Sequence, residues 1–260
     1  MLYLIKILKF VLIGTIIISF FSCVNKKNQS NHSDEEINMG NSTAEDNQIS
    51  YKEQFAFFSG DPYLFIFVDK KNELASDYEP QDLVKLKSGH LLRAAAAASL
   101  EEMSAAAAQE GLNLVVSSAY RSYKYQAEVF ARNVKAMGEY EANRVSARPG
   151  QSQHQLGLVV DFGSITNEFA RTREGIWIYN NASRFGWSLS YPQGYEELTG
   201  YSWESWHYRY VGKELAEFID TYFDGIQHNA LEFIQEAQKN NAIVSGKDFM
   251  HAMQGGIIIK

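Results

Sequence analysis

The chain of 260 residues is poor in cysteine, and it lacks an excess of basic residues. Its one cysteine, Cys23, excludes an internal disulfide and any zinc site built from several thiolates, so a metal site would have to use histidine and carboxylate side chains. Lys and Arg number 24 against 31 Asp and Glu. Because no basic surplus is available to neutralise a phosphate backbone, nucleic acid is not an expected partner.

The rest of the composition is that of a folded protein. Hydrophobic residues make up 45% of the chain and charged residues 21%, which favours a soluble domain over a disordered chain or a multi-span membrane protein. The aromatic content of 13% predicts a well-packed core, with rings available to line a groove. This length allows one domain with extra segments, or two small domains.

The first residues have the pattern of an export signal. Lys6 and Lys9 supply positive charge, and residues 10–21 form an apolar run that is short for a spanning helix, which needs about 20 residues. The small Ser22 and then Cys23 follow. This pattern resembles a lipoprotein signal, so we expect residues 1–22 to be a lipoprotein signal peptide and Cys23 to carry the lipid. An uncleaved anchor and plain secretion are the alternatives.

In each of these cases the remainder of the chain is exported, and we expect it to be a cell-envelope protein anchored to a membrane with its domain outside the cytoplasm. Residues 23–50 contain almost no large apolar side chains. They cannot bury enough surface to offset their ordering entropy, so we interpret them as a flexible tether. We assign residues 51–225 to the folded domain and residues 226–260 to a C-terminal helical extension of unknown role.

Within the domain, apolar patterns and turn residues predict both helices and strands. We expect strands over 64–68, 112–118, 158–162 and 206–211. We expect helices over 91–110, 122–137, 171–185 and 213–222, and a further one over 230–239 in the tail. Because strands and helices do not alternate as strict βαβ units, the pattern favours an α+β fold.

Three segments hold polar residues that are hard to explain as ordinary surface, namely 117–126, 148–163 and 201–212. Asp161 lies in an otherwise apolar strand pattern, and a carboxylate buried there must be paired or bound to a metal. Its odd spacing from His154 places the two on opposite faces of a straight strand, but Gly157 between them offers a bend. Taken singly, each of His154, His207, Asp161 and Glu204 also has an ordinary structural explanation.

Taken together, these residues form motifs that favour a functional site over separate structural roles. Ser152-x-His154-x-x-Gly157-x-x-x-Asp161 is followed by Glu204-x-x-His207, and the segment SAYRSYKYQ precedes both. In this order they resemble the VanY-type D-alanyl-D-alanine carboxypeptidases, which belong to a wider group of zinc peptidases with the lysostaphin-like enzymes and the hedgehog fold. The resemblance covers residues 69–220. The chain departs from the family pattern at Ser205, where proline is common, and at 159–160, away from any ligand position.

The resemblance implies a central antiparallel sheet flanked by helices, with His154, Asp161 and His207 binding one Zn²⁺ per chain. It implies that Glu204 is the catalytic base, and because three residues do not return to the same face of a strand, Glu204 should lie in the turn that enters the strand of His207. Arg121 is implied as the cation that stabilises the developing oxyanion and contacts substrate.

Other assignments by family position are finer. Gln126 and Ser152 are implied as hydrogen-bonding groups for the substrate. Arg209 shares a strand face with His207, and two interpretations stay open for it, orientation of groups behind the site or a pair with a carboxylate. We expect the aromatic side chains of the same strand to pack in the core, namely Trp206, Tyr208 and Tyr210.

We therefore expect a monomeric zinc carboxypeptidase that removes the terminal D-alanine from peptidoglycan stem peptides. One alternative is L,D-carboxypeptidase activity on tetrapeptide stems. Another is a non-catalytic, zinc-stabilised module that binds cell-wall peptides. The presence of Glu204 favours catalysis, because hydrolysis needs a base and binding does not.

Overall fold

The structure is a computed structural model that describes residues 61–239, all within one compact unit that spans 58–242. The predicted signal peptide, the tether with Cys23 and the end of the tail lie outside the described residues. None of the helices found between residues 61 and 239 is long and apolar enough to cross a bilayer.

A four-stranded antiparallel sheet forms the centre of the fold, in the order β3-β4-β6-β5. The strands are β3 (Val116–Ser118), β4 (Val159–Phe162), β5 (Trp187–Leu189) and β6 (His207–Tyr210). The two middle strands are buried along nearly their whole length, which explains why 158–162 is so apolar in sequence. Two further strands, β1 (Leu83–Lys85) and β2 (Leu91–Arg93), pair as a separate antiparallel hairpin.

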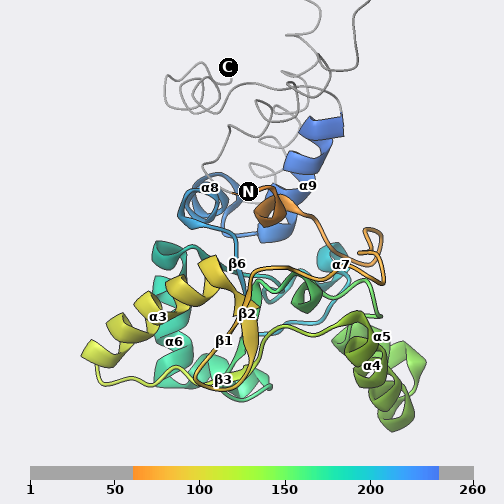
Figure 1. Cartoon of the computed structure of the whole chain (residues 1–260), viewed down its shortest axis with the longest axis horizontal. Coiled ribbons are helices and arrows are strands. Elements are labelled where there is room, and N and C mark those ends of the chain that lie inside the picture. The colour runs from red at the N-terminus through yellow and green to blue at the C-terminus, as the bar shows by residue number, and fades with distance from the viewer. Residues whose placement is uncertain (1–60, 240–260) are drawn as a thin grey trace, which may run out of the picture. The chain divides into compact units, whose positions relative to one another are not determined.

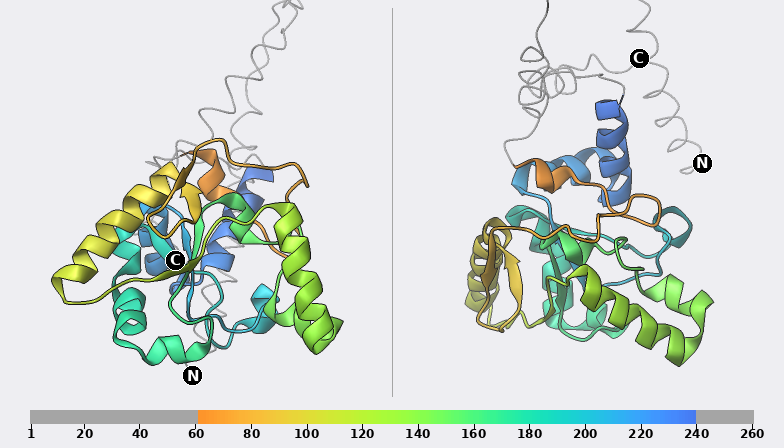
Figure 2. Two further views of the ribbon diagram at one scale, coloured as in Figure 1. Left: turned by 60° about the horizontal axis from the view of Figure 1, so that its bottom comes forward. Right: turned by 45° about the vertical axis from the view of Figure 1, so that its right-hand side comes forward.

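Helices surround this sheet, and α3 lies on the opposite side of the molecule from α4 and α5 (Figure 1 and Figure 2). The helices are α3 (Ala94–Gln109), α4 (Tyr123–Met137), α5 (Glu139–Val145), α6 (Arg173–Asn181), α7 (Glu196–Thr199), α8 (Lys213–Phe223) and α9 (Gln227–Lys239). Four short 3-10 helices join them, namely η1 (Pro62–Phe65), η2 (Gln153–Leu156), η3 (Asn167–Arg171) and η4 (Ala182–Phe185). The predicted α+β fold is confirmed.

The sheet has two different faces because side chains alternate along each strand. One face is aromatic: the ring of Phe162 lies 6.4 Å from that of Trp187 and 6.0 Å from that of Tyr208. Tyr210 packs against Trp187 as well, with ring centroids 5.5 Å apart. The expected core packing is therefore confirmed for Tyr208 and Trp206, which are buried, whereas Tyr210 is only half-buried at the end of β6. The other face carries Asp161 and His207.

The predicted strand over 64–68 is wrong. Pro62 starts a 3-10 helix there, and its fixed φ suits the first turn of a helix. The carbonyl groups of Leu64 and Ile66, which a strand would use in a ladder, instead accept hydrogen bonds from the buried guanidinium of Arg209 at 2.9 and 2.8 Å. Four apolar side chains of this segment are buried without any strand pairing, namely Leu64, Phe65, Phe67 and Val68.

The predicted helix over 91–110 begins three residues late, because Leu91–Arg93 is strand β2 and only the alanine run that follows is helical. The predicted helix over 171–185 divides into α6 and η4, and Gly186 ends it with a φ of +84°. The helix predicted over 122–137 is α4, and Ser122 caps it by accepting a hydrogen bond from the backbone N–H of Tyr125.

Gly157 makes the bend that the sequence suggested. It ends η2 with a φ of +68° and is followed by β4. A Cβ at this position would lie 2.9 Å from Leu83 Cδ2 and 3.0 Å from Arg93 Cγ, so both the backbone conformation and the space exclude a side chain.

We predict that Gly157→Ala lowers the free energy of unfolding by about 2–4 kcal/mol, because left-handed strain adds to a steric clash. Gly89→Ala is the matched control, since Gly89 has a φ of +88° but nothing within 4 Å of the added Cβ. This control should lose only about 1 kcal/mol. Chemical denaturation measures both, and equal losses would contradict the steric part of the argument.

Candidate active site

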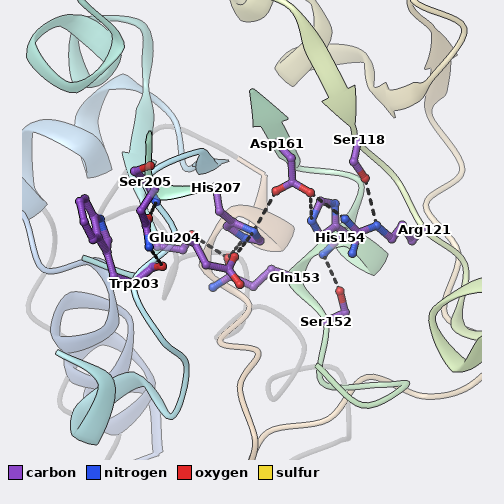
Figure 3. A network of polar contacts seen from close by, with 12 residues as sticks. Ser118, Arg121, Ser152, Gln153, His154, Asp161, Trp203, Glu204, Ser205 and His207 are labelled. Atoms are coloured by element: carbon purple, nitrogen blue, oxygen red, sulfur yellow. Dashed lines mark hydrogen bonds and ion pairs between the residues drawn. The ribbon is translucent and has the colours of Figure 1, made fainter. Parts of the chain in front are cut away.

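Three potential metal ligands converge on the polar face of the sheet (Figure 3). Asp161 and His207 are register partners on β4 and β6. His154 comes from η2, and the turn at Gly157 brings it back to the same point despite its odd spacing from Asp161. His154 Nε2 lies 3.2 Å from Asp161 Oδ2, and His207 Nδ1 lies 3.2 Å from Asp161 Oδ1.

This geometry fits a zinc ion. The three ligand atoms all lie within 4.8 Å of one another. Zinc bonds to nitrogen and oxygen of about 2.0–2.2 Å place tetrahedral ligand atoms roughly 3.3 Å apart. Asp161 Oδ1 is buried and makes no hydrogen bond within residues 61–239, so it faces His207 Nδ1 with no protein donor assigned to it. Two such acceptors repel each other unless a cation or a proton lies between them.

Backbone and amide carbonyl groups orient both imidazoles toward this point. His154 Nδ1 lies 2.6 Å from the carbonyl oxygen of Ala119, and His207 Nε2 lies 3.3 Å from Gln153 Oε1. An oxygen acceptor requires N–H on the nitrogen that it faces. The nitrogens that remain for a metal are therefore His154 Nε2 and His207 Nδ1, and both of these face Asp161.

Glu204 lies beside the three ligands. Its carbonyl accepts a hydrogen bond from the backbone N–H of His207 at 3.2 Å, so it stands at the turn into β6, where the sequence placed it. Glu204 Oε2 is 3.2 Å from His207 Nδ1, and the side chain is buried. Burial raises the pKa of this carboxyl and outweighs the lowering effect of His207.

Arg121 approaches from the opposite side of Asp161. Its Nη2 donates to Asp161 Oδ2 at 2.7 Å, its Nε donates to Ser118 Oγ at 3.0 Å, and its Nη1 lies 3.4 Å from Gln126 Oε1. Its side chain keeps 17% exposure, whereas that of Asp161 keeps 3%. The guanidinium is thus fixed at three points and remains accessible to a ligand.

Comparison with known proteins places this arrangement in a family. The family model described as VanY, D-alanyl-D-alanine carboxypeptidase, matches residues 89–213, which contain all five of the residues just described. A solved structure of a mutant vancomycin resistance D,D-pentapeptidase VanY in complex with Zn(II) is 32% identical, with a TM-score of 0.57. The match covers 98% of that chain and 65% of this one. The chain belongs to the VanY family.

Other members are equally similar. The solved structure of the LdcB LD-carboxypeptidase is 35% identical, with a TM-score of 0.55, over 62% of this chain and 85% of that one. The protein YodJ of Bacillus subtilis (strain 168) is 37% identical over 172 residues, which cover 60% of this chain and 63% of YodJ. The chain thus spans less than two thirds of the length of this curated relative.

The charges of this VanY-family site are strongly coupled. Burial pushes the pKa of Asp161 upward, but His154 and His207 outweigh it and hold the pKa well below its usual value. Burial, aided by the charge of Arg121, lowers the pKa of His154 to about 4. Burial would also lower the pKa of His207, but the carboxylates of Asp161 and Glu204, each 3.2 Å from His207 Nδ1, prevail and raise the pKa to about 9.

Gln126 and Ser152 lie close to the site but are already engaged. Gln126 is 1% exposed, and its amide donates to the carbonyl of Ala147 at 2.7 Å while its oxygen faces Arg121. Ser152 is buried and caps η2 by accepting from the N–H of His154 at 3.3 Å. Their proposed contacts with substrate stay predictions. As they lie, Gln126 orients Arg121 and Ser152 orients the segment of His154.

Arg209 takes neither of the two roles left open for it. Its guanidinium is fully buried and donates to the backbone carbonyls of Leu64 and Ile66, and it forms no ion pair with a carboxylate in the described part of the chain. It therefore attaches η1 to the sheet and acts in the fold.

Sequence reasoning missed the residues behind His207. Gln153 Oε1 faces His207 and also accepts from Ser190 Oγ at 2.7 Å. Gln227, the first residue of α9, is 1% exposed and lies 3.4 Å from both Gln153 and Ser190. Gln153 lies inside a motif and Gln227 lies beyond residue 213, and no spacing or composition around either residue indicates a role at the site. Their position behind His207 follows from the three-dimensional structure alone.

We predict that zinc affinity depends steeply on pH, because His207 must lose a proton for the metal to bind. With its pKa at about 9 and that of His154 at about 4, one proton should be released per zinc at neutral pH. Apparent affinity should therefore rise about tenfold per pH unit between about pH 6 and about pH 8 and level off near the pKa of His207.

Competition against a zinc chelator, corrected for the chelator's own protonation, measures this dependence. Calorimetry in two buffers of different ionisation enthalpy counts the released protons independently. A flat affinity across this range, with no proton release, would contradict the assignment of the proton to His207.

Proposed function

We propose that this chain is a zinc-dependent carboxypeptidase that removes the C-terminal D-alanine from peptidoglycan stem peptides. The observation that carries the proposal is the meeting of His154, Asp161 and His207 at metal-binding distances with a buried carboxylate, Glu204, at their edge. A structural zinc site has four protein ligands, whereas a catalytic site keeps one position open.

When bound by these three side chains, zinc supplies a Lewis acid that polarises a carbonyl and acidifies a water molecule. Glu204 is placed to accept the proton of the attacking water and to deliver it to the departing amine. Its buried position and raised pKa suit it to hold that proton between the two steps. Because Glu204 Oε2 lies 3.2 Å from His207 Nδ1, its carboxylate would lie beside a metal held by His207 and the other two ligands.

Arg121 supplies the second stabilising charge. Negative charge develops on the scissile carbonyl oxygen, and a cation that is already oriented lowers its energy without reorganising. The contacts of Arg121 with Ser118, Gln126 and Asp161 hold its guanidinium in place, and its partial exposure leaves an edge for substrate.

The D,D-specificity is our leading proposal, supported by the family description and by the nearly complete coverage of the D,D-pentapeptidase VanY. L,D-activity on tetrapeptide stems is the second candidate, supported by the similarity to the LdcB LD-carboxypeptidase. A zinc-stabilised binding module is disfavoured, because a buried acid such as Glu204 costs stability and binding alone gives it no use.

We also propose that the protein acts outside the cytoplasm, as a monomeric lipoprotein anchored through Cys23. The support is the apolar run of residues 10–21 followed by this cysteine, and the polar segment that would let the domain reach away from the membrane.

The experiment that tests the specificity is incubation of the zinc-loaded domain with defined penta- and tetrapeptide stems, followed by mass analysis. Loss of one alanine from the pentapeptide alone supports D,D-activity. Loss from the tetrapeptide alone supports the L,D alternative. No product from either peptide, at full zinc occupancy, would reject both.

We predict that Glu204→Gln keeps zinc but lowers turnover by at least about 10²-fold, the usual scale for loss of a general base. Glu197→Ala is the matched control, since Glu197 is an exposed acid on α7, in the same stretch of chain, and makes no contact with the site. Metal analysis and the peptide assay are run on both variants. Wild-type turnover in Glu204→Gln would remove this residue from the mechanism.

A further inference from the structure

The side chain of Asn167 joins the two peptide groups that flank Glu204. Its Nδ2 donates to the carbonyl oxygen of Trp203 at 2.9 Å, and its Oδ1 accepts from the backbone N–H of Ser205 at 3.1 Å. We propose that Asn167 is a positioning residue that holds the Glu204 carboxylate beside the metal ligands. This inference rests on the function proposed above for Glu204.

Four hydrogen bonds hold the two peptide groups on either side of Glu204. The peptide before it is held by Asn167 at the Trp203 carbonyl and by the Tyr191 carbonyl, which accepts from the Glu204 N–H at 3.1 Å. The peptide after it is held by His207 at the Glu204 carbonyl and by Asn167 at the Ser205 N–H. Asn167 thus supplies one of the two fixed points of each peptide.

Two fixed points define the orientation of a peptide plane, whereas a single hydrogen bond allows it to rotate. The two soft dihedral angles of Glu204 connect these two planes. When both planes are held, the direction of the Glu204 Cα–Cβ bond is set. When the Asn167 amide is lost, each plane keeps one contact, and the carboxylate can turn away from His207.

Asn167 is itself on a supported element. It begins η3, which follows closely after β4, the strand of Asp161. Phe169 in the same 3-10 helix is 3% exposed and packs against Gly163, where a Cβ would lie 2.6 Å from the Phe169 ring. The element that carries Asn167 is therefore packed against the end of β4, and the amide links the strand of a metal ligand to the turn of the proposed base.

Ser205 is the departure from the family pattern noted above, and it supplies the donor that this contact needs. A proline at that position would fix φ and would have no N–H. The serine hydroxyl makes no hydrogen bond in the described residues although it is buried, so the contribution of Ser205 comes from its backbone. In this chain the amide of Asn167 restrains a turn that lacks the ring of proline.

A residue that only stabilised the turn would act on folding and on zinc binding as well as on turnover. A positioning residue for Glu204 should act on kcat and leave the metal ligands unaffected. We therefore expect Asn167→Ala to lower kcat by between about tenfold and about hundredfold, with KM and zinc affinity changed by less than about twofold.

Asn167→Asp is the second variant, because it keeps the shape of the side chain and the acceptor for Ser205. It places an oxygen against the Trp203 carbonyl where the donor stood, so it should release that peptide and lower kcat in the same way. If Asn167→Ala does not fold, the kcat of Asn167→Asp tests the positioning role instead. Glu168→Ala, a change at an exposed residue of the same 3-10 helix, is the control and should keep wild-type kcat.

Two readouts separate positioning from general stability. In the Glu204→Gln background, Asn167→Ala should cause no further loss of turnover, because the group that it positions is already gone. Amide hydrogen exchange of residues 203–206 should become at least about tenfold faster in Asn167→Ala, with or without substrate. Unchanged kcat in both Asn167 variants would overturn the inference. Unchanged exchange, or a loss of zinc affinity that matches the loss of turnover, would overturn it as well.

Failure of this inference is distinguishable from failure of the proposed function. If the wild-type protein binds zinc but cleaves neither stem peptide, the proposed function fails, and the exchange measurement still decides whether Asn167 holds the turn. If Glu204→Gln loses turnover while both Asn167 variants keep it, the function stands and the positioning role is wrong.

Discussion

The structure depends on the neutralisation of one buried carboxylate, that of Asp161. A charge in the middle strand of a sheet is costly unless opposite charges or a metal surround it. Here two imidazoles and a guanidinium reach it from three different segments. Each of these segments has to be where it is for the charge of Asp161 to be compensated, so the same requirement also brings together the residues of the candidate site.

The residues of the candidate site come partly from strands and partly from short turns. β4 and β6 provide Asp161 and His207 at a register that the ladder fixes. The remaining groups come from turns that a strand could not provide: His154 from η2 and Glu204 from the loop into β6. Turns need their own restraints, and here these are a glycine in a left-handed conformation, backbone carbonyls and the amide of Asn167.

Much of this could be predicted from the sequence, and the remainder has physical reasons for being hidden. The apolar run of β4 and the alanine run of α3 follow from burial and helix propensity, and the bend at Gly157 follows from an odd spacing that only a glycine could reconcile. The strand predicted over 64–68 was wrong because most of its side chains are buried, as in a strand, while the carbonyls of Leu64 and Ile66 accept hydrogen bonds from Arg209. This arginine lies about 145 positions away in the sequence. Asn167, Gln153 and Gln227 are neutral amides at the first residues of helices, where no periodicity in the sequence indicates a role.

The place of Gln227 has a consequence for where this catalytic unit ends. The family model stops at residue 213, yet Gln227, fourteen positions later at the start of α9, contacts the amide of Gln153, which faces the candidate metal ligand His207. A fragment trimmed at the family limit would keep every reactive group and lose the last link of the chain of amides behind His207. The hydrogen bonds behind the site therefore extend past the matched segment into α9, and removing α9 would take away one partner of Gln153, the amide that faces His207.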